Sequence, residues 1–472
     1  MNYRKTSLLL GSIALFLASI LIPTFEFLIW FAFVPLLIAI HQWPTVKSVL
    51  GGLAVGILFF AGLLYWITYY ELRIFVIVIS LVTPFFGLFA LFTKWISRKF
   101  KNEVLLIFAP PIAWSAVAFL YSLTPLEIIG DQIAFIQAPL FPGIVRLTGI
   151  SGITFLILLA NSLIARWLIR KDKTTGVGIF AMALILMLGV FSPAPVKTNP
   201  IKVALIQHNF PIPSDWRFIH RKDVIITYEK AIRDLGSTVD LIVFPQYGLP
   251  IDVLREPQWL NGLAKLANTS ILLGTYIPKL PGGKIGEGEQ FDTALLFSPQ
   301  RAVQDYRAMT PPPFRKIGQI RGTKRAPLFL DNTKIGVMLC YEDTRPREGK
   351  MWIKNGAEIL VALSNPGHFL GTPLPRYHLL HDRIRAIETG RYVIRASPNG
   401  FSAIIDPKGK ILTQSKLSEE KILKGVVYPL NKMTPFAKSG TLLPPISFLL
   451  SLILLLWSYG RDSMKRLARK IR

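Results

Sequence analysis

The sequence predicts a polytopic α-helical membrane domain of about eight spans together with one layered α/β domain. Of its 472 residues, 51% are hydrophobic and only 17% are charged, whereas soluble globular chains carry about 25% charged residues. The apolar residues gather in long blocks before residue 195 and after residue 440, and about 20 such residues cross a bilayer as a helix. The segment between the blocks alternates short apolar strands with helical patterns, as layered α/β domains do.

Eight apolar runs are expected to span the membrane as helices. They are Ser7 to Phe25, Glu26 to Ile40, Val49 to Tyr69, Ile74 to Trp95, Val104 to Leu123, Ile150 to Ile169, Thr175 to Phe191 and Leu442 to Tyr459. The first run follows basic residues, as a signal peptide would. It lacks a cleavage site with small residues, however, and a second run begins at once, so we expect it to remain in the protein.

The distribution of Lys and Arg predicts how the chain crosses the membrane. Residues 98–101, 166–173 and 461–472 are rich in these residues, whereas the alternate connections near Thr24 and Glu71 are nearly free of them. The positive-inside rule therefore puts both termini in the cytoplasm. The expected domains are residues 1–192 with the first seven spans, residues 193–440 as an extracytoplasmic domain, and residues 441–472 with the last span and a basic cytoplasmic tail.

The chain is strongly basic, with a formal net charge of +26, an isoelectric point of about 10.1 and a mean hydropathy of +0.43. A basic chain suggests nucleic-acid binding, but here much of the charge flanks the spans. We interpret it mainly as orientation signals and solvated surface charge. Attraction of the outer domain to anionic phospholipid head groups is the second interpretation. No nucleic-acid partner is expected.

The central segment has the strand and helix pattern of an α/β domain. The expected strands are Lys202 to Gln207, Asp240 to Pro245, Ser270 to Tyr276, Ala294 to Ser298, Lys334 to Leu339 and Ile359 to Leu363. The expected helices are Asp223 to Leu235, Arg347 to Asn355 and Tyr377 to Gly390.

Cys340 is the only cysteine of the chain, so a disulfide within the chain is impossible. It follows the strand that ends at Leu339 and precedes a helical stretch. Helix N-terminal amides and nearby cations can lower the pKa of a thiol in such a place, and an unpaired cysteine outside the cytoplasm is a candidate reactive group. The alternative is a small buried apolar residue, which is what most lone cysteines are.

The sequence Leu339-Cys340-Tyr341-Glu342 resembles the nucleophile motif of the apolipoprotein N-acyltransferases, a membrane branch of the nitrilase superfamily. The order of spans, domain and last span is also that of the family. Further segments that resemble it are Phe244-Pro245-Gln246, Ser364-Asn365, residues 383–391, residues 397–403 and residues 434–440. The resemblance implies a bacterial inner-membrane protein whose outer domain is a nitrilase-like αββα sandwich.

The resemblance also implies a reaction. Family members transfer an acyl chain from a phospholipid, through a cysteine thioester, to the N-terminal amine of a diacylglyceryl-cysteine lipoprotein. Cys340, followed by Tyr341, would be the nucleophile, and Glu342 would position it or act as a substitute base. The substrate-binding residues would be Asn365, Arg315 and Lys316. No cofactor and no metal are expected.

This chain departs from the family pattern at the positions that carry the chemistry. Gln246 occupies the position of the glutamate that acts as general base, and Ala308 occupies the position of the lysine that stabilises the oxyanion. Arg315 and Lys316 stand where the family has Gly-Glu after a Pro-Phe pair. An amide cannot accept a proton at neutral pH, so both base and cation are missing from their usual places.

Three explanations of these departures stay open. Activity persists, reduced or altered, with Glu342 as base and Arg307, Arg315 or Lys316 as cation. Alternatively, the chain is a non-catalytic relative that binds lipid or lipoprotein, or Gln246 and Ala308 were introduced deliberately to trap an inactive state. A different class of function is a membrane-held amidase of the nitrilase type, which would need the same missing groups.

Two histidines one helical turn apart, His378 and His381, form the remaining candidate site. A metal site would need further ligands, and the HExxH pattern of zinc proteases is absent. We therefore expect an ordinary helix surface here.

Overall fold

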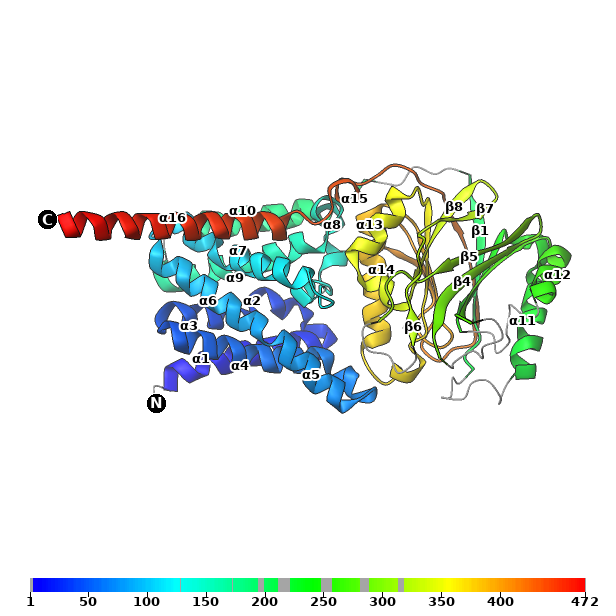
Figure 1. Cartoon of the computed structure of the whole chain (residues 1–472), viewed down its shortest axis with the longest axis horizontal. Helices are drawn as coiled ribbons and strands as arrows, with labels where there is room; N and C mark the ends of the chain where they lie inside the picture. Colours follow the sequence, from blue (N-terminus) through cyan, green and yellow to red (C-terminus); the bar gives the residue numbers. More distant parts are fainter. Residues whose placement is uncertain are drawn as a thin grey trace. The chain divides into compact units, whose positions relative to one another are not determined.

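The structure is a computed structural model that describes residues 3–127, 129–171, 173–193, 199–210, 221–247, 257–280, 288–312 and 318–471 (Figure 1). The chain divides into two compact units. Met1–Phe191 and Thr441–Arg472 form the first, which we call the helical unit, and Ser192–Gly440 forms the second, the α/β unit.

Helices make up the ordered part of the helical unit. Its α-helices are α1 (Tyr3–Leu21), α2 (Ile29–Ala32), α3 (Val34–Gln42), α4 (Thr45–Leu64), α5 (Leu72–Val82), α6 (Pro84–Lys99), α7 (Glu103–Ser122), α8 (Pro142–Thr148), α9 (Ile150–Arg170), α10 (Lys173–Gly189) and α16 (Leu443–Ile471). Short 3₁₀ turns lie between them at Pro23–Leu28, Tyr65–Tyr69, Ile129–Asp131 and Ala138–Leu140.

Among the described residues, six helical stretches are long and apolar enough to cross a membrane. They are Pro23–Gln42, Thr45–Tyr69, Leu72–Lys99, Glu103–Ser122, Ile150–Arg170 and Leu443–Met464. The first and seventh predicted spans correspond to two shorter apolar helices, Thr6–Leu21 and Lys173–Gly189. Each predicted apolar run is therefore helical, and the total of eight spans stays a prediction.

An aromatic cluster forms the centre of the helical unit. The ring of Phe33 lies 4.7 Å from Phe16 and 5.2 Å from Trp114, each edge to face, and Phe86 lies 5.1 Å from Trp114. Asn161 of α9 ties in the start of α3, because its Oδ1 accepts from the Phe33 amide at 2.9 Å. Where lipid surrounds a protein, small polar residues facing other helices join them in this way.

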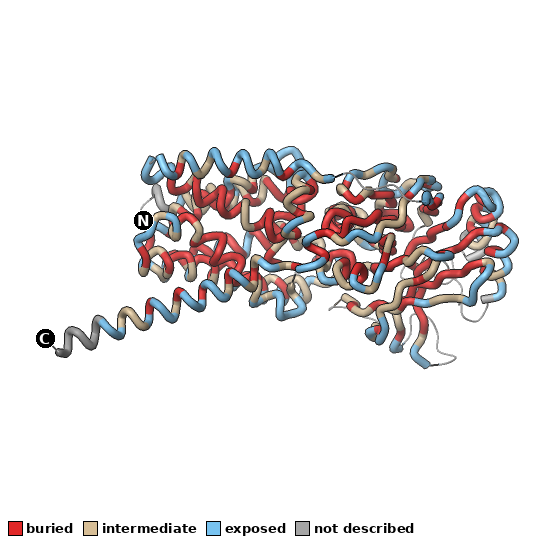
Figure 2. The backbone as a smooth tube through the Cα atoms, turned by 90° about the horizontal axis from the view of Figure 1, so that it is seen from above, coloured by how far each residue is buried: buried red, intermediate tan, exposed pale blue. Residues whose placement is uncertain are grey.

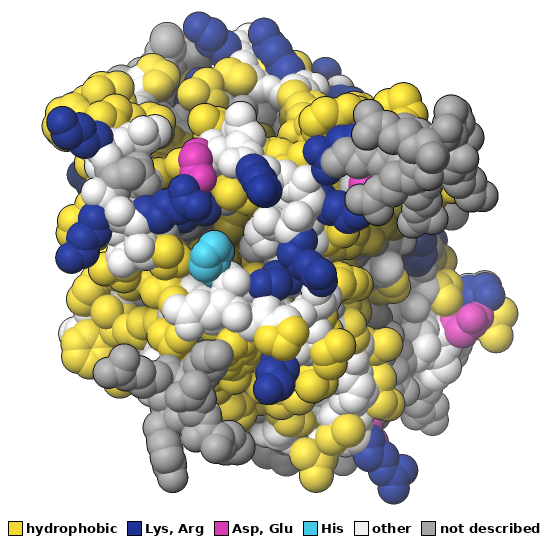
Figure 3. Space-filling view, turned by 90° about the vertical axis from the view of Figure 1, so that its left-hand side faces the viewer, with side chains coloured by type: hydrophobic (Ala, Val, Ile, Leu, Met, Phe, Trp, Pro, Cys, Tyr) yellow, Lys and Arg dark blue, Asp and Glu magenta, His cyan; other side chains and the backbone are white. Residues whose placement is uncertain are grey.

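The basic segments meet at one end of the helical unit. Lys99 at the end of α6 forms an ion pair with Asp462 of α16, and Arg461 donates to the Lys99 carbonyl at 2.7 Å. Arg170 at the end of α9 pairs with Glu103, which begins α7, at 2.6 Å. Figure 3, which looks onto the end of this unit that carries both termini, shows Lys and Arg side chains among hydrophobic ones. The three basic segments identified in the sequence therefore share one end.

Two sheets form the middle of the α/β unit. The first has the order β13-β1-β2-β3-β4-β5, with β6 paired to β4, and the second has the order β12-β11-β10-β9-β8-β7. The strands of the first are β1 (Ile201–Gln207), β2 (Leu241–Gln246), β3 (Ser270–Pro278), β4 (Gln290–Ser298), β5 (Arg301–Arg307), β6 (Gln319–Ile320) and β13 (Lys421–Val427). Those of the second are β7 (Leu328–Leu330), β8 (Thr333–Leu339), β9 (Ile359–Leu363), β10 (Val393–Ala396), β11 (Ala403–Ile405) and β12 (Ile411–Gln414).

Helices cover both outer faces of this pair of sheets (Figure 1). The helices α11 (Arg221–Leu235) and α12 (Pro257–Ala267) lie on the first sheet, and α13 (Pro346–Lys354) and α14 (Leu374–Thr389) lie on the second. One apolar core fills the space between the sheets, with members such as Leu272. A second core, which includes Leu260, lies under α11 and α12.

The layered arrangement follows from the pattern of apolar residues. Strands β2, β3, β8 and β9 are buried almost throughout. Figure 2 shows buried stretches of the chain, in red, in the interior of each unit. Strands with apolar residues on both faces need cover on both sides. The predicted αββα sandwich is confirmed, and the predicted strands and helices agree with the observed ones to within a few residues.

The first prediction concerns His208, which follows β1 and is buried in the α/β unit, where its Nδ1 accepts from the Phe210 amide at 2.9 Å. Burial lowers the pKa of His208 to about 4. The folded-state pKa lies below the unfolded value of about 6.5, so the unfolded state binds the proton more readily and stability falls as pH drops through this window. Between pH 7 and pH 5, the free energy of unfolding of His208→Gln should therefore fall by about 2 kcal/mol less than that of the parent protein.

The measurement is denaturant unfolding of the detergent-solubilised chain at the two pH values, with spectroscopic detection of the α/β unit. His368→Gln, the same substitution at an exposed position, is the matched control. A parent protein and a His208→Gln variant with the same response to pH would contradict this account of His208.

Candidate active site

Cys340 lies at the corner where β8 ends and a 3₁₀ turn, Cys340–Thr344, begins. Its φ angle is +49°, in the left-handed region that residues with a side chain rarely adopt. Such strain costs about 1 to 3 kcal/mol and occurs preferentially at functional sites. Cys340 is also partly exposed, although Leu339 before it is buried. Cys340 therefore differs from the small buried apolar residue that was the alternative interpretation.

Glu342 fixes the shape of this corner from inside the protein. Its carboxylate is fully buried. Oε2 accepts from the Leu339 amide at 2.9 Å. Oε1 accepts from the Tyr306 hydroxyl at 2.8 Å, the Met309 amide at 2.8 Å and the Thr310 amide at 3.1 Å. The carboxylate thus joins the end of β8 to the segment that follows β5.

The same contacts bear on the two predicted roles of Glu342. Burial and the nearby Glu348 raise the pKa of Glu342 to about 8, against the opposing effect of its hydrogen-bond donors. Both carboxylate oxygens already accept hydrogen bonds from groups of the protein itself. A general base needs an oxygen directed at the proton that it removes, so this geometry favours positioning of Cys340 over the role of substitute base.

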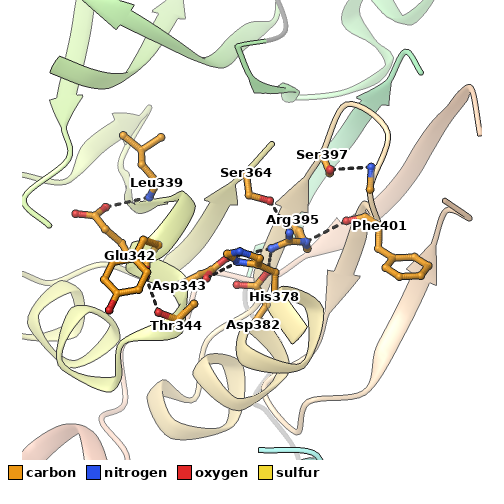
Figure 4. A network of polar contacts seen from close by, with 12 residues as sticks. Leu339, Glu342, Asp343, Thr344, Ser364, His378, Asp382, Arg395, Ser397 and Phe401 are labelled. Carbon is orange, nitrogen blue, oxygen red and sulfur yellow. Dashed lines mark hydrogen bonds and ion pairs between the residues drawn. The ribbon is translucent and has the colours of Figure 1, made fainter. Parts of the chain in front are cut away.

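A second buried network lies beneath the corner (Figure 4). Asp343 accepts from His378 Nδ1 at 2.8 Å and from Arg395 at 3.1 Å, and Arg395 also binds Asp382 at 2.6 Å and Ser364. Burial alone would raise the pKa of Asp343, but His378 and Arg395 outweigh it and hold that pKa below its usual value. Burial raises the pKa of Asp382 to about 7 despite Arg395. The network attaches the residue after Glu342 to α14 and β10.

His378 and His381 correct the expectation of an ordinary helix surface. Both side chains are buried, because α14 packs on the corner and on β10 with the face that carries them. Burial lowers the pKa of His381 to about 3. Among the described residues, no group of three His, Cys, Asp or Glu side chains could hold a metal ion.

Gln246 occupies a fully buried position at the end of β2. Its Nε2 donates to the Asp292 carboxylate at 2.6 Å and to the Tyr247 hydroxyl at 2.9 Å. Its Oε1 has no hydrogen-bond partner among the described residues. The end of β2 is tightly packed, because a Cβ on Gly274 of β3 would lie 2.8 Å from the Gln246 Cα.

Ala308 directly follows β5 and is buried in the core between the sheets. Its amide donates to the Asp292 carbonyl at 2.8 Å. Asp292 therefore contacts both substituted positions, Gln246 through its side chain and Ala308 through its backbone. Since the next residue, Met309, donates to Glu342, a continuous set of contacts links residues 246 and 308 to the corner that carries Cys340.

The other predicted site residues take no part in the contacts described above for Glu342 and Gln246. Tyr341 is partly exposed, and the Arg345 guanidinium lies 5.8 Å from the centre of its ring. Asn365 follows β9, the neighbour of β8, and its Oδ1 accepts from the Gly367 amide at 3.1 Å. Arg307 pairs with Asp305 at the surface. Arg315 and Lys316 lie outside the described residues.

Sequence reasoning did not find Asp292, Asp343 or Arg395. The strand Val393–Ala396 was not predicted from the sequence. Arg395 within this short apolar run was the signal that could have indicated a buried pair, because burying a charge requires a partner. The identity of that partner depends on which strands and helices become neighbours.

The fold and the site define a class of protein: a membrane protein with an αββα domain and a cysteine at a strained strand end. The family described as carbon-nitrogen hydrolase matches residues 202–428. The family described as apolipoprotein N-acyltransferase N-terminal domain matches residues 12–163.

Similar proteins extend over most of the chain. The apolipoprotein N-acyltransferase of Geobacter metallireducens is 27% identical over 451 residues, covering 86% of this chain and 86% of its own. That of Nitrosomonas europaea is 25% identical, covering 83% and 82%. That of Haemophilus influenzae is 25% identical, covering 89% and 82%. The chain belongs to the apolipoprotein N-acyltransferase family.

The second prediction tests the role of Glu342. Glu342→Gln replaces one acceptor oxygen by an amide group, which leaves a buried backbone donor without a partner and should lower the free energy of unfolding by about 1 to 3 kcal/mol. Tyr306→Phe removes a single donor and should cost less, about 1 kcal/mol. Thermal unfolding of both variants in detergent measures the difference. A Glu342→Gln protein as stable as the parent would show that the carboxylate does not hold the corner.

Proposed function

We propose that this chain transfers an acyl chain from a phospholipid, through a thioester on Cys340, to the N-terminal amine of diacylglyceryl-cysteine lipoproteins. The observation that carries the proposal is Cys340 itself, which is partly exposed at a strained corner in a chain of this family. Curated relatives named apolipoprotein N-acyltransferase, similar over most of the chain, support the same reaction.

The chemistry has two halves that pass through Cys340. The thiol first gives up its proton, and sulfur attacks the acyl ester carbonyl of the phospholipid. The ester C–O bond breaks, and the departing alcohol of the lysophospholipid takes up a proton. The lipoprotein amine then attacks the thioester, an amide bond forms, and the amine's proton is passed on as the thiolate leaves.

The proposed location is the bacterial inner membrane, with both termini in the cytoplasm and the α/β unit on the outer face. The long apolar helices support a membrane location. The gathering of three basic segments at one end of the helical unit supports this orientation, because such segments stay on the cytoplasmic side. The phospholipid donor and the lipoprotein acceptor would reach Cys340 from the outer leaflet.

Activity should be lower than in a protein with the full set of groups. Residue 246 is an amide and residue 308 has no charge, and loss of one preorganised charged or hydrogen-bonding group typically costs about 10² to 10³ in rate. The same two residues support the second candidate function, a non-catalytic homologue that binds lipid or lipoprotein. The carbon-nitrogen hydrolase match leaves a membrane-held amidase as a third.

The third prediction is an acyl adduct on Cys340. After incubation of the purified chain with phospholipid, intact-protein mass spectrometry should detect one added acyl chain, because the thioester is the intermediate of the reaction. A diacylglyceryl peptide should then remove the adduct and gain an amide-linked chain. Cys340→Ala is the matched control and should form no adduct. An adduct that water alone removes, with no acylated peptide, would favour the hydrolase.

The fourth prediction separates a weak enzyme from a silenced one. Gln246→Glu, Asp292→Asn and Ala308→Lys together supply a carboxylate at residue 246, an amide in contact with it in place of Asp292, and a cation at residue 308. Acylation of Cys340 should become faster by about 10²-fold or more, since these groups act on the charge that develops in the transition state. A parent that stays unmodified while the triple variant becomes acylated would identify a non-catalytic relative with an intact scaffold. If neither protein is acylated, transferase activity of this fold is contradicted.

A further inference from the structure

A carboxylate lies next to the position where this chain has lost one. Asp292 of β4 is buried and stands opposite Tyr276 of β3 in the antiparallel register. Its Oδ2 is 2.6 Å from Nε2 of Gln246, the residue at the family's general-base position. The carboxyl group absent from residue 246 is therefore present one hydrogen bond away, on β4, which β3 separates from β2 in the sheet.

Surrounding side chains hold the Gln246 amide in one orientation. Nε2 donates both to Asp292 and to the Tyr247 hydroxyl. The Tyr247 ring stacks on Tyr276 with 3.9 Å between centroids, and Gln319 donates to the Tyr276 hydroxyl at 3.0 Å. Because both amide hydrogens have acceptors, Oε1 is directed away from Asp292 and has no partner among the described residues. The Asp292 carboxylate and Oε1 of Gln246 are thus both held in fixed orientations.

The backbone of Asp292 connects this pair to the nucleophile's corner. Its carbonyl accepts from the Ala308 amide at 2.8 Å. The next residue, Met309, donates to the Glu342 carboxylate, which also accepts from the Leu339 amide directly before Cys340. Asp292 is therefore a buried carboxylate in contact with both positions, with residue 246 through its side chain and with residue 308 through its backbone.

We propose that Asp292 is the acid–base group of this site, with Gln246 as its positioning residue. This inference rests on the proposed acyl transfer. The Asp292 carboxylate takes the proton of the Cys340 thiol, directly or through one water, as sulfur bonds to the acyl carbon. The carboxylic acid returns that proton to the departing lysophospholipid alcohol. In the second half, Asp292 takes a proton from the attacking amine and passes it to the Cys340 sulfur as the C–S bond breaks, which restores the carboxylate and the thiol.

The fifth prediction uses a charge exchange between the two partners. Asp292→Asn removes the carboxylate at nearly constant shape and should slow acylation of Cys340 by about 10²-fold or more, the usual contribution of a general base. Gln246→Glu together with Asp292→Asn restores the same amide–carboxylate pair with its ends exchanged, and should recover most of the rate. Asp305→Asn, at an exposed carboxylate on the neighbouring strand, is the control and should leave the rate unchanged.

The measurement is the single-turnover rate of thioester formation on Cys340 as a function of pH. A p-nitrophenyl acyl ester is the first probe, because its leaving group needs no proton, and phospholipid vesicles are the second. The parent and the exchange variant should lose activity at low pH as their carboxylate is protonated. The rate of the Asp292→Asn variant should instead rise with pH as the thiol loses its proton, and the usual pKa of a thiol is about 8.5. Thermal unfolding of each variant separates this effect from a loss of fold.

The two probes keep the inference distinct from the proposed function. Dependence on Asp292 with the nitrophenyl ester, together with no adduct from phospholipid, would refute lipid acyl transfer and leave the role of Asp292 standing. The role of Asp292 would be overturned if Asp292→Asn and the parent protein reacted with the nitrophenyl ester at the same rate and with the same pH profile. This conclusion would hold whether or not phospholipid vesicles acylate Cys340.

Discussion

The arrangement of the α/β unit around Cys340 depends on one buried carboxylate, that of Glu342. It accepts from the amide of Leu339, directly before Cys340, and from two successive amides after β5, so it joins the second sheet to the first. Amides at a strand end have lost their partners in the sheet, and leaving them buried and unbonded costs about 1 to 3 kcal/mol each. Because Glu342 satisfies them, Cys340 can remain in a left-handed conformation on a rigid corner.

The two sides of this corner differ in the charged groups that they carry. Toward α14, the ion pairs among Asp343, Arg395 and Asp382 form a fully buried support. Toward β2 and β5, the framework is equally well packed, but residue 246 is an amide and residue 308 is a methyl group. Under the proposed function, the fold would keep the means of holding the nucleophile and would lack the usual groups that act on its proton and on the oxyanion. Asp292, bonded to Gln246, places a charge within that changed region.

Much of the fold could be predicted because it follows from local patterns. The apolar runs predicted the long helices of the helical unit, and the strand ending at Leu339 was expected one residue from its observed start at Thr333. What could not be predicted depends on tertiary neighbours. His378 and His381 were expected at a helix surface because a helical pattern alone does not identify the face that Asp343 occupies. Asp292 was missed because cross-strand register decides that its side chain meets Gln246.

The central claim is that a chain with Gln246 and Ala308 still acts as an acyltransferase through Cys340. Its most direct test is the N-terminal mass of a lipoprotein from bacteria in which this chain replaces the host's own enzyme of the family. The account predicts a lipoprotein with an added amide-linked acyl chain, formed slowly, and none in cells that carry Cys340→Ala. A lipoprotein that keeps a free N-terminal amine in both strains would contradict it.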